Sequence, residues 1–339
     1  MLASPAASGN ADLPAPVNSV PDDPRLDRRS ADVSRTPRAY PRRVALTLVR
    51  NLPVSAASGL VRVAGVTHVV ADDELHLLAL PDDGPPQTLR LLPGDLPADP
   101  RARKAIKPDF EALCRWHDGL LALGSGSTAM RHRGCLVRPV AGDLSLASVT
   151  ELDLTPLHTH LAARVPALNL EGAAVASDPL LGDSLVLLQR GNGRGNRSAL
   201  VSLDAAAVAR ALADNAAWDA SLVRDLHFID LGDRAGAPLA FTDASPLPDG
   251  SLVFLAAAED SPDTYRDGVL TGVAIGRLAP DRTIRWLTDV PAAPKLEGVH
   301  AELVGDALHL WLVADPDDRS VPAPLFTATL DAATGAWLA

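Results

Sequence analysis

Residues 169–176 read NLEGAAVA, and this stretch is one of four copies of a pattern that decides the fold. In each copy an acidic residue is followed by a small residue and then by apolar residues. The copies are DFEALCRW (109–116), NLEGAAVA (169–176), FTDASPLP (241–248) and KLEGVHAE (295–302). A weaker fifth copy, AASGLVRV (56–63), has Ser58 in the acidic position. The copies lie about 50 to 70 residues apart, a spacing typical of four-stranded propeller blades with variable loops.

A second apolar strand is expected after each copy. These strands are ELHLLAL (74–80), GLLALGS (119–125), SLVLLQR (184–190), SLVFLAA (251–257) and ALHLWLV (307–313). Short strands separated by Gly, Asp and Pro, with helical patterns only at 203–213 and 157–164, indicate an all-β chain. We therefore predict a β-propeller of five blades, with six as the alternative if residues 205–240 contain another blade.

The strand RVALTLVRNL (43–52) precedes the first repeat and has no blade of its own. We expect it to complete the last blade, because this closure removes an exposed sheet edge. Residues 1–42 are rich in Pro, Ala, Ser, Asp and Arg and lack periodicity, which predicts a disordered N-terminal tail. Residues 43–339 are then expected to form a single propeller domain.

Composition excludes several classes of protein. The chain has 339 residues, 47% of them hydrophobic, and a formal net charge of −11. A diffuse negative field repels phosphate backbones, so we expect no nucleic-acid partner. No apolar run is long enough to span a membrane, and we expect no membrane partner for the protein. The N-terminus lacks the pattern of a signal peptide, which predicts a cytoplasmic protein if Met1 is the true start.

The repeated acids are expected to converge in space. The innermost strand of each propeller blade lines the central channel, so equivalent residues of different repeats form a ring. That ring would contain Glu111, Glu171, Asp243 and Glu297. Converging carboxylates repel one another, and a hard, oxygen-loving cation such as Ca2+ or Mg2+ would neutralise them. Two other interpretations stay open: the acids accept backbone N–H bonds that join blades, or they act as acid and base without metal.

The loops after the second strands open on the same face. Their matching positions are Asp82, Ser127, Asn192, Glu259 and Asp315. Arginines gather in or beside these loops, and arginine forks beside a cation suit an anionic ligand. The candidates for substrate binding are Arg131, Arg190, Arg197 and Arg266. The alternative is that each arginine pairs with an acid or is solvated.

The segments KPDFEALCRWHDGLLALGSGST (107–128), NLEGAAV, KLEGV and FTDASPLPDGSLVFLAAAED (241–260) carry a family resemblance. They resemble an uncharacterised bacterial β-propeller family and, more distantly, the phytase-like and calcium-dependent lactonase (strictosidine-synthase-like) propellers. In the calcium-dependent relatives, acids at the start of inner strands hold the metal. The resemblance therefore implies the same four acids as ligands, although the lactonase Asn ligands are missing here.

Two functions follow as hypotheses. The first is a metal-dependent hydrolase, with Ca2+ or Mg2+ as the candidate ion, of a small anionic or ester-like substrate at the channel mouth. The second is a non-catalytic propeller that binds a ligand or a protein at the same face. The sequence identifies neither the substrate nor a protein partner, because propellers host many functions.

Overall fold

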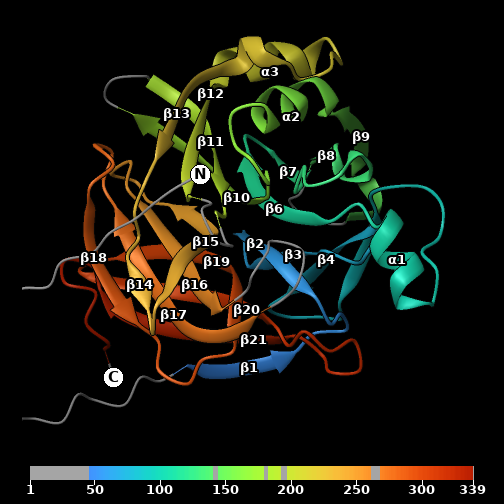
Figure 1. Cartoon of the computed structure of the whole chain (residues 1–339). Helices are drawn as coiled ribbons and strands as arrows, with labels where there is room; N and C mark the ends of the chain where they lie inside the picture. Colours follow the sequence, from blue (N-terminus) through green and yellow to red (C-terminus); the bar gives the residue numbers. More distant parts are fainter. Residues whose placement is uncertain (1–45, 140–143, 179–181, 192–196, 261–267, 339) are drawn as a thin grey trace, which may run out of the picture. The chain divides into compact units, whose positions relative to one another are not determined.

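A computed structural model describes residues 46–139, 144–178, 182–191, 197–260 and 268–338. The predicted tail at 1–42 lies outside these residues. The model is all-β apart from short helices, and its strands form five antiparallel sheets arranged as the blades of a propeller. The five-blade prediction is therefore confirmed. Figure 1 shows the innermost strands β2, β6, β10, β15 and β19 gathered around the centre.

Each blade runs outward from its inner strand in chain order. The first contains β2 (Ala57–Val63), β3 (Val66–Ala71), β4 (His76–Pro81) and β5 (Gln87–Arg90). The second contains β6 (Phe110–Trp116), β7 (Gly119–Gly124), β8 (Arg133–Arg138) and β9 (Ser148–Asp153). The third contains β10 (Leu170–Asp178), β11 (Gly182–Gln189), β12 (Ala199–Asp204) and β13 (Val223–Phe228).

The fourth blade has an additional short strand beside its inner strand. It contains β14 (Asp233–Arg234), β15 (Ala237–Pro246), β16 (Leu252–Asp260), β17 (Val269–Leu278) and β18 (Ile284–Asp289). The fifth contains β19 (Lys295–Val304), β20 (Ala307–Asp315), β21 (Pro324–Asp331) and β1 (Thr47–Asn51). Since β1 pairs with β21, the N-terminal strand closes the last blade as predicted.

The core consists of side chains between adjacent blades rather than one central cluster. The described residues form five buried apolar clusters, one at each interface between neighbouring blades. Leu, Val and Ala dominate these clusters, as the low aromatic content requires. Burying both faces of each blade in this way stabilises the ring without an apolar centre.

Three helices lie outside the sheets. The predicted helices are present as α2 (Thr155–Ala162) and α3 (Ala205–Ala213). Helix α1 (Pro100–Ile106) was not predicted, because it buries no residue and so has no apolar stripe. Asp99 caps α1 by accepting a 2.8 Å bond from the Ala102 amide, and the helix ends at Lys107. No helix among the described residues is long and apolar enough to cross a membrane.

One strand assignment from the sequence is wrong. The second strand of the first blade is β3 (Val66–Ala71), and the predicted segment 74–80 forms the third strand. A two-residue turn joins β2 to β3, in which Ala64 and Gly65 have φ of 49° and 79°. Such turns match the twist of a hairpin and leave no visible loop. The hairpin is therefore easy to overlook in the sequence.

The inner strands approach one another closely just after their repeated acids. A Cβ on Gly298 would lie 2.3 Å from the Ser58 carbonyl oxygen, and one on Gly172 would lie 2.9 Å from the Asp243 Cα. A larger side chain at either position would push neighbouring blades apart. We call this level of the channel, around Gly172, Asp243 and Gly298, the waist. The close approach of the strands there explains why the repeat has a small residue after its acid.

Candidate functional site

Each inner strand has a β-bulge at its repeated polar residue. The pairing with the second strand shifts between the residues that flank Glu111, Glu171 and Glu297. The first blade shifts in the same way around Ser58 and Gly59. A bulge leaves its residue out of the ladder and re-aims its side chain. These four side chains line one cavity at the mouth of the channel.

In the fourth blade the bulged residue is Thr242, not Asp243. Thr242 is fully buried and donates a 2.8 Å hydrogen bond to the Leu296 carbonyl oxygen. Asp243 is one residue further along, at the waist, and does not line the mouth cavity. Its Oδ2 accepts a 2.8 Å bond from the Val299 amide of the next blade. The structure therefore brings together Glu111, Glu171 and Glu297 of the predicted ring and separates Asp243 from them.

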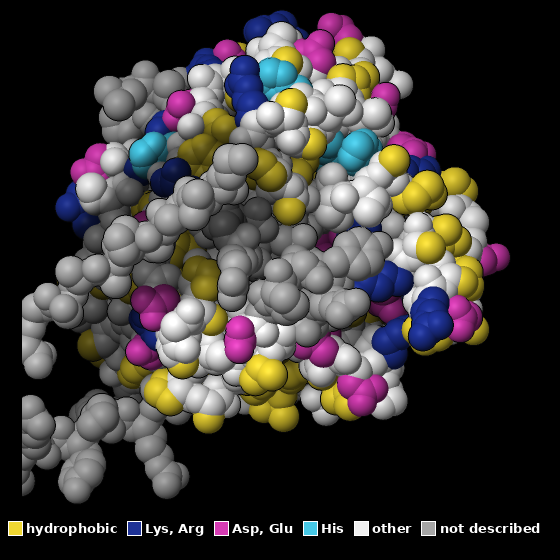
Figure 2. Space-filling view, in the orientation of Figure 1, with side chains coloured by type: hydrophobic (Ala, Val, Ile, Leu, Met, Phe, Trp, Pro, Cys, Tyr) yellow, Lys and Arg dark blue, Asp and Glu magenta, His cyan; other side chains and the backbone are white. Residues whose placement is uncertain are grey.

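The mouth cavity has a volume of about 410 Å³ and a lining dominated by charged side chains. Inner strands supply the acids just described. The loops after the second strands supply Asp72, Ser127 and Arg190, and Asp315 is the last residue of β20. The segment after α1 supplies Lys107 and Asp109. On the face drawn in Figure 2, acidic and basic side chains intermingle over the surface instead of forming separate areas.

Arg190 and Lys295 neutralise one side of the ring. Arg190 donates 2.9 Å hydrogen bonds to both Glu171 and Glu259. The Lys295 ammonium lies 2.8 Å from Glu297 and 3.4 Å from Glu259. All five side chains are at least nine-tenths buried, so these pairs are only weakly screened by solvent. This side of the ring is a closed network between blades.

Lys107 and Arg131 form ion pairs with the carboxylates on the other side of the mouth cavity. The Lys107 ammonium contacts Asp72 and lies 2.9 Å from Asp109. Arg131 donates 2.6 Å and 2.7 Å bonds to Asp109 and Ser127. Asp109 has a φ of 56°, a left-handed conformation that is uncommon outside glycine. Strained backbone of this kind clusters at functional sites.

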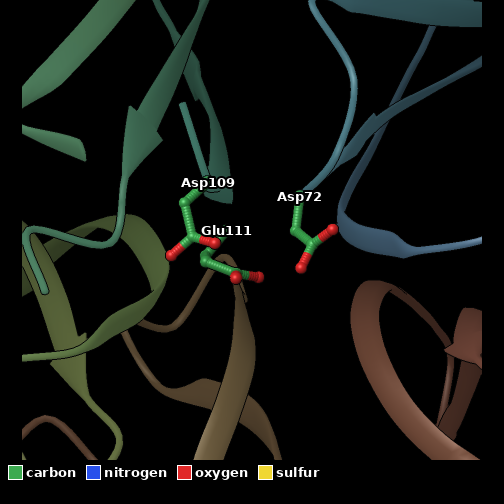
Figure 3. A group of neighbouring side chains, drawn as sticks. All are labelled: Asp72, Asp109 and Glu111. Carbon is green, nitrogen blue, oxygen red and sulfur yellow. The ribbon is translucent and has the colours of Figure 1, made fainter. Parts of the chain in front are cut away.

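Glu111 differs from the other acids of the ring. Among the described residues, no hydrogen bond or ion pair joins it. Figure 3 shows its carboxylate turned toward those of Asp72 and Asp109, and one oxygen from each of the three lies within 4.8 Å of the other two. Burial, followed by repulsion from Glu171, Asp109 and Asp72, raises the pKa of Glu111 well above its usual value. The position is therefore one where a positive charge or a proton is favoured.

Other carboxyls of the mouth are shifted in the same direction. Burial raises the pKa of Asp72 to about 6, against the attraction of Lys107. Burial also raises the pKa of Glu171 to about 7 and that of Asp315 to about 8. Carboxyls with pKa values near neutrality inside a cavity are candidates for binding or catalysis.

The predicted arginines have different locations. Arg131 and Arg190 are in the mouth, where ion pairs occupy them. Arg197 is exposed and stacks on the Phe228 ring at 4.7 Å, outside the cavity lining. Arg266, like Asn192, lies outside the described residues.

Among the acids of the second predicted ring, Asp82 is in the wrong place. It is paired with Arg62 beyond the mouth, because it follows the third strand of its blade. The residue that follows the second strand is Asp72, which sequence reasoning missed together with Asp109 and Lys107. The Ala64–Gly65 turn was the signal that could have identified Asp72.

A family model matches residues 53–330, which cover nearly all of the five blades. The chain belongs to this family of unknown function, DUF6929. No curated protein matches the chain. The family assignment therefore agrees with the propeller and specifies no activity.

Several solved structures are similar to the chain. A hypothetical protein from Leishmania major has 12% identity and a TM-score of 0.46, over 84% of this chain and 90% of that one. The Dos1 propeller has 12% identity and a TM-score of 0.35. The match covers 82% of this chain but only 56% of the length of the Dos1 chain. A streptogramin B lyase has 10% identity and a TM-score of 0.36, over 84% and 96% of the two chains. At these identities no activity can be transferred.

Proposed function

We propose that this protein is a hydrolase of a small anionic, ester-like molecule, with a divalent cation held at the mouth by Asp72, Asp109 and Glu111. The observation that carries the proposal is the convergence of these three carboxylates, each of which has one oxygen within 4.8 Å of an oxygen of the other two. Carboxylates without His or Cys suit Ca2+ or Mg2+. Burial, together with repulsion from Glu171, Asp109 and Asp72, raises the pKa of Glu111, and a bound cation would offset the cost of keeping this carboxylate ionised.

The predicted ligand set changes in this proposal. Glu171 and Glu297 have buried cationic partners, and Asp243 accepts backbone hydrogen bonds, so their charges are already compensated. Glu111 is retained, and the two new ligands adjoin it. The ligands would come from two adjacent blades: Asp72 follows β3 of the first blade, and in the second Asp109 directly precedes β6 and Glu111 lies at its start (Figure 3).

Lys107 is the competing cation in this site. Its ammonium contacts Asp72 and Asp109, so an ion bound between them would displace it toward the cavity. There it would lie beside Arg131, and the two positive groups would orient an anionic substrate. The ion would polarise the scissile group or lower the pKa of a bound water.

A second candidate function is supported by the closed ion-pair network. Arg190 and Lys295 compensate three carboxylates without any ion, which gives a preorganised polar cavity. Such a cavity suits a non-catalytic site for a small polar ligand. The two candidates differ in their requirement for a divalent cation.

The test is a thermal melt with Ca2+, with Mg2+ and with a chelator, on the wild-type protein and on Glu111→Gln. A ligand of the folded state raises its stability by mass action, about 2.7 kcal/mol at a hundred times the Kd. We expect a Ca2+-dependent shift that Glu111→Gln loses, while Glu151→Gln, an exposed control outside the cavity, keeps it. A shift in all three proteins would contradict the assigned ligands.

If no cation shifts the wild-type melt, the hydrolase is wrong and the non-catalytic candidate remains. If the shift is present, lactones and phosphoesters are the substrates to assay, each with and without chelator. Turnover that resists the chelator would contradict the role of the ion.

A further inference from the structure

A second cavity lies further along the inner strands, beyond the waist of the channel. It has a volume of about 110 Å³, and all five inner strands contribute to its lining. The lining begins two residues after the bulged positions, at Leu60 in β2 and Leu113 in β6. The inner strands therefore connect two separate cavities at opposite sides of the waist.

Three basic groups from adjacent blades line this second cavity. They are Arg62 of β2, Arg115 of β6 and His300 of β19. Arg115 is exposed and donates its Nε to the His117 carbonyl oxygen at 3.1 Å. Among the described residues, nothing pairs with the two terminal nitrogens of Arg115. Its two Nη atoms can therefore donate hydrogen bonds to a ligand in the cavity.

Arg62 is held rigidly at the same cavity. One Nη donates 2.8 Å and 3.1 Å bonds to Asp82 and Thr67, and the other Nη donates to the second carboxylate oxygen of Asp82. The guanidinium also stacks on the Trp311 ring at 4.7 Å. Its side chain is only 14% exposed, whereas Asp82 is 54% exposed. Asp82 therefore fixes the position of Arg62, and among the described residues the terminal nitrogens left for a ligand at this cavity are those of Arg115.

We propose that this second cavity binds a phosphate-sized oxyanion between Arg62, Arg115 and His300. Guanidinium forks match the geometry of phosphate oxygens, and a volume of about 110 Å³ accommodates an ion of that size. The occupant is either free phosphate or the phosphoryl group of a small molecule. This site is independent of the divalent cation proposed for the mouth, because the two cavities share no lining residue.

His300 reports directly on this site. The charged groups that face it are Glu302, 3.4 Å from its Nε2, and the guanidinium groups of Arg62 and Arg115. Burial lowers the pKa of His300, Glu302 raises it, and the two arginines lower it further. An oxyanion between the arginines would cancel their field and favour the imidazolium.

The experiment is a titration of the full chain with inorganic phosphate, followed by NMR of the His300 ring and by calorimetry. Phenyl phosphate is the second arm, and tighter binding of it would identify a phosphoryl group as the natural occupant. We expect saturable binding that raises the pKa of His300. Arg115→Ala should weaken binding about tenfold or more, because it removes charge-assisted hydrogen bonds.

Two further variants make the result specific. Arg285→Ala removes an exposed arginine outside both cavities and should leave phosphate binding unchanged. Glu302→Gln removes the carboxylate that competes for His300 and should strengthen binding. Equal affinity in Arg115→Ala and the wild-type protein, or a His300 resonance that phosphate does not move, would overturn the proposal.

Discussion

The carboxylate of Asp243 in β15 accepts a 2.8 Å hydrogen bond from the backbone amide of Val299 in β19. This bond joins the fourth blade to the fifth at the waist. Burial nevertheless raises the pKa of Asp243 well above its usual value. The acid therefore fastens the fourth blade to the fifth and lines neither cavity.

Replacing Asp243 tests this fastening role. Asp243→Ala should lower the free energy of unfolding by about 1 to 3 kcal/mol or more, because it leaves the buried Val299 amide unpaired. Asp243→Asn retains an acceptor oxygen of the same size and should lose less. Urea denaturation of the two variants measures the difference. Equal losses would mean that the hydrogen bond contributes little.

Arg190 is predicted to stabilise the ring strongly. Arg190→Met leaves Glu171 and Glu259 buried without their shared guanidinium, which should cost about 3 to 5 kcal/mol. The variant Arg190→Met/Glu171→Gln should recover part of that loss, because one uncompensated charge is removed. A double-mutant cycle from chemical denaturation gives the coupling between the two residues. A coupling energy of zero would contradict the network.

Lys107 should weaken cation binding at the mouth. Lys107→Met removes the ammonium that contacts Asp72 and lies 2.9 Å from Asp109, so the Ca2+-induced rise in melting temperature should increase. Arg101→Met in the preceding helix α1 is the matched control, since Arg101 is exposed and lies outside the cavity lining. The prediction fails if both variants respond to Ca2+ as the wild-type protein does.

The narrow waist predicts a cost for one added methyl group. Gly298→Ala would place a Cβ 2.3 Å from the Ser58 carbonyl oxygen, so the strands must shift, at about 1 to 3 kcal/mol. The second blade has Ala112 at the equivalent position, and Ala112→Gly should cost only about 1 kcal/mol. Thermal melts of both variants compare the two positions. An unchanged melting temperature for Gly298→Ala would contradict the close approach.

His68 should make the protein less stable in acid. It is fully buried, and burial lowers its pKa from 6.5 to about 4. Below pH 6.5 the unfolded chain binds a proton that the folded chain refuses, so stability falls as the pH drops toward 4. The full loss is about 3 kcal/mol. In His68→Leu, the free energy of unfolding should depend less on pH between 6.5 and 4 than it does in the wild-type protein, as measured by urea denaturation at several pH values.

The sequence by itself determined the repeating architecture. The acid–small–apolar pattern marks the inner strands, and the strand before the first repeat indicates the closure that β1 makes with β21. These features are local, since each depends on periodicity within one short segment. The same local pattern could not reveal the Ala64–Gly65 hairpin, which has almost no loop, or α1, which has no apolar face.

Only the tertiary structure decided what each acid does. The repeat aligns Asp243 with Glu111, Glu171 and Glu297, but the bulge in β15 falls on Thr242 and sends Asp243 to the waist. The partners Lys107, Arg190 and Lys295 reach the ring from different segments, and Asp72 comes from a neighbouring blade. A carboxylate's charge state depends on burial and on such distant neighbours, and no local pattern contains either.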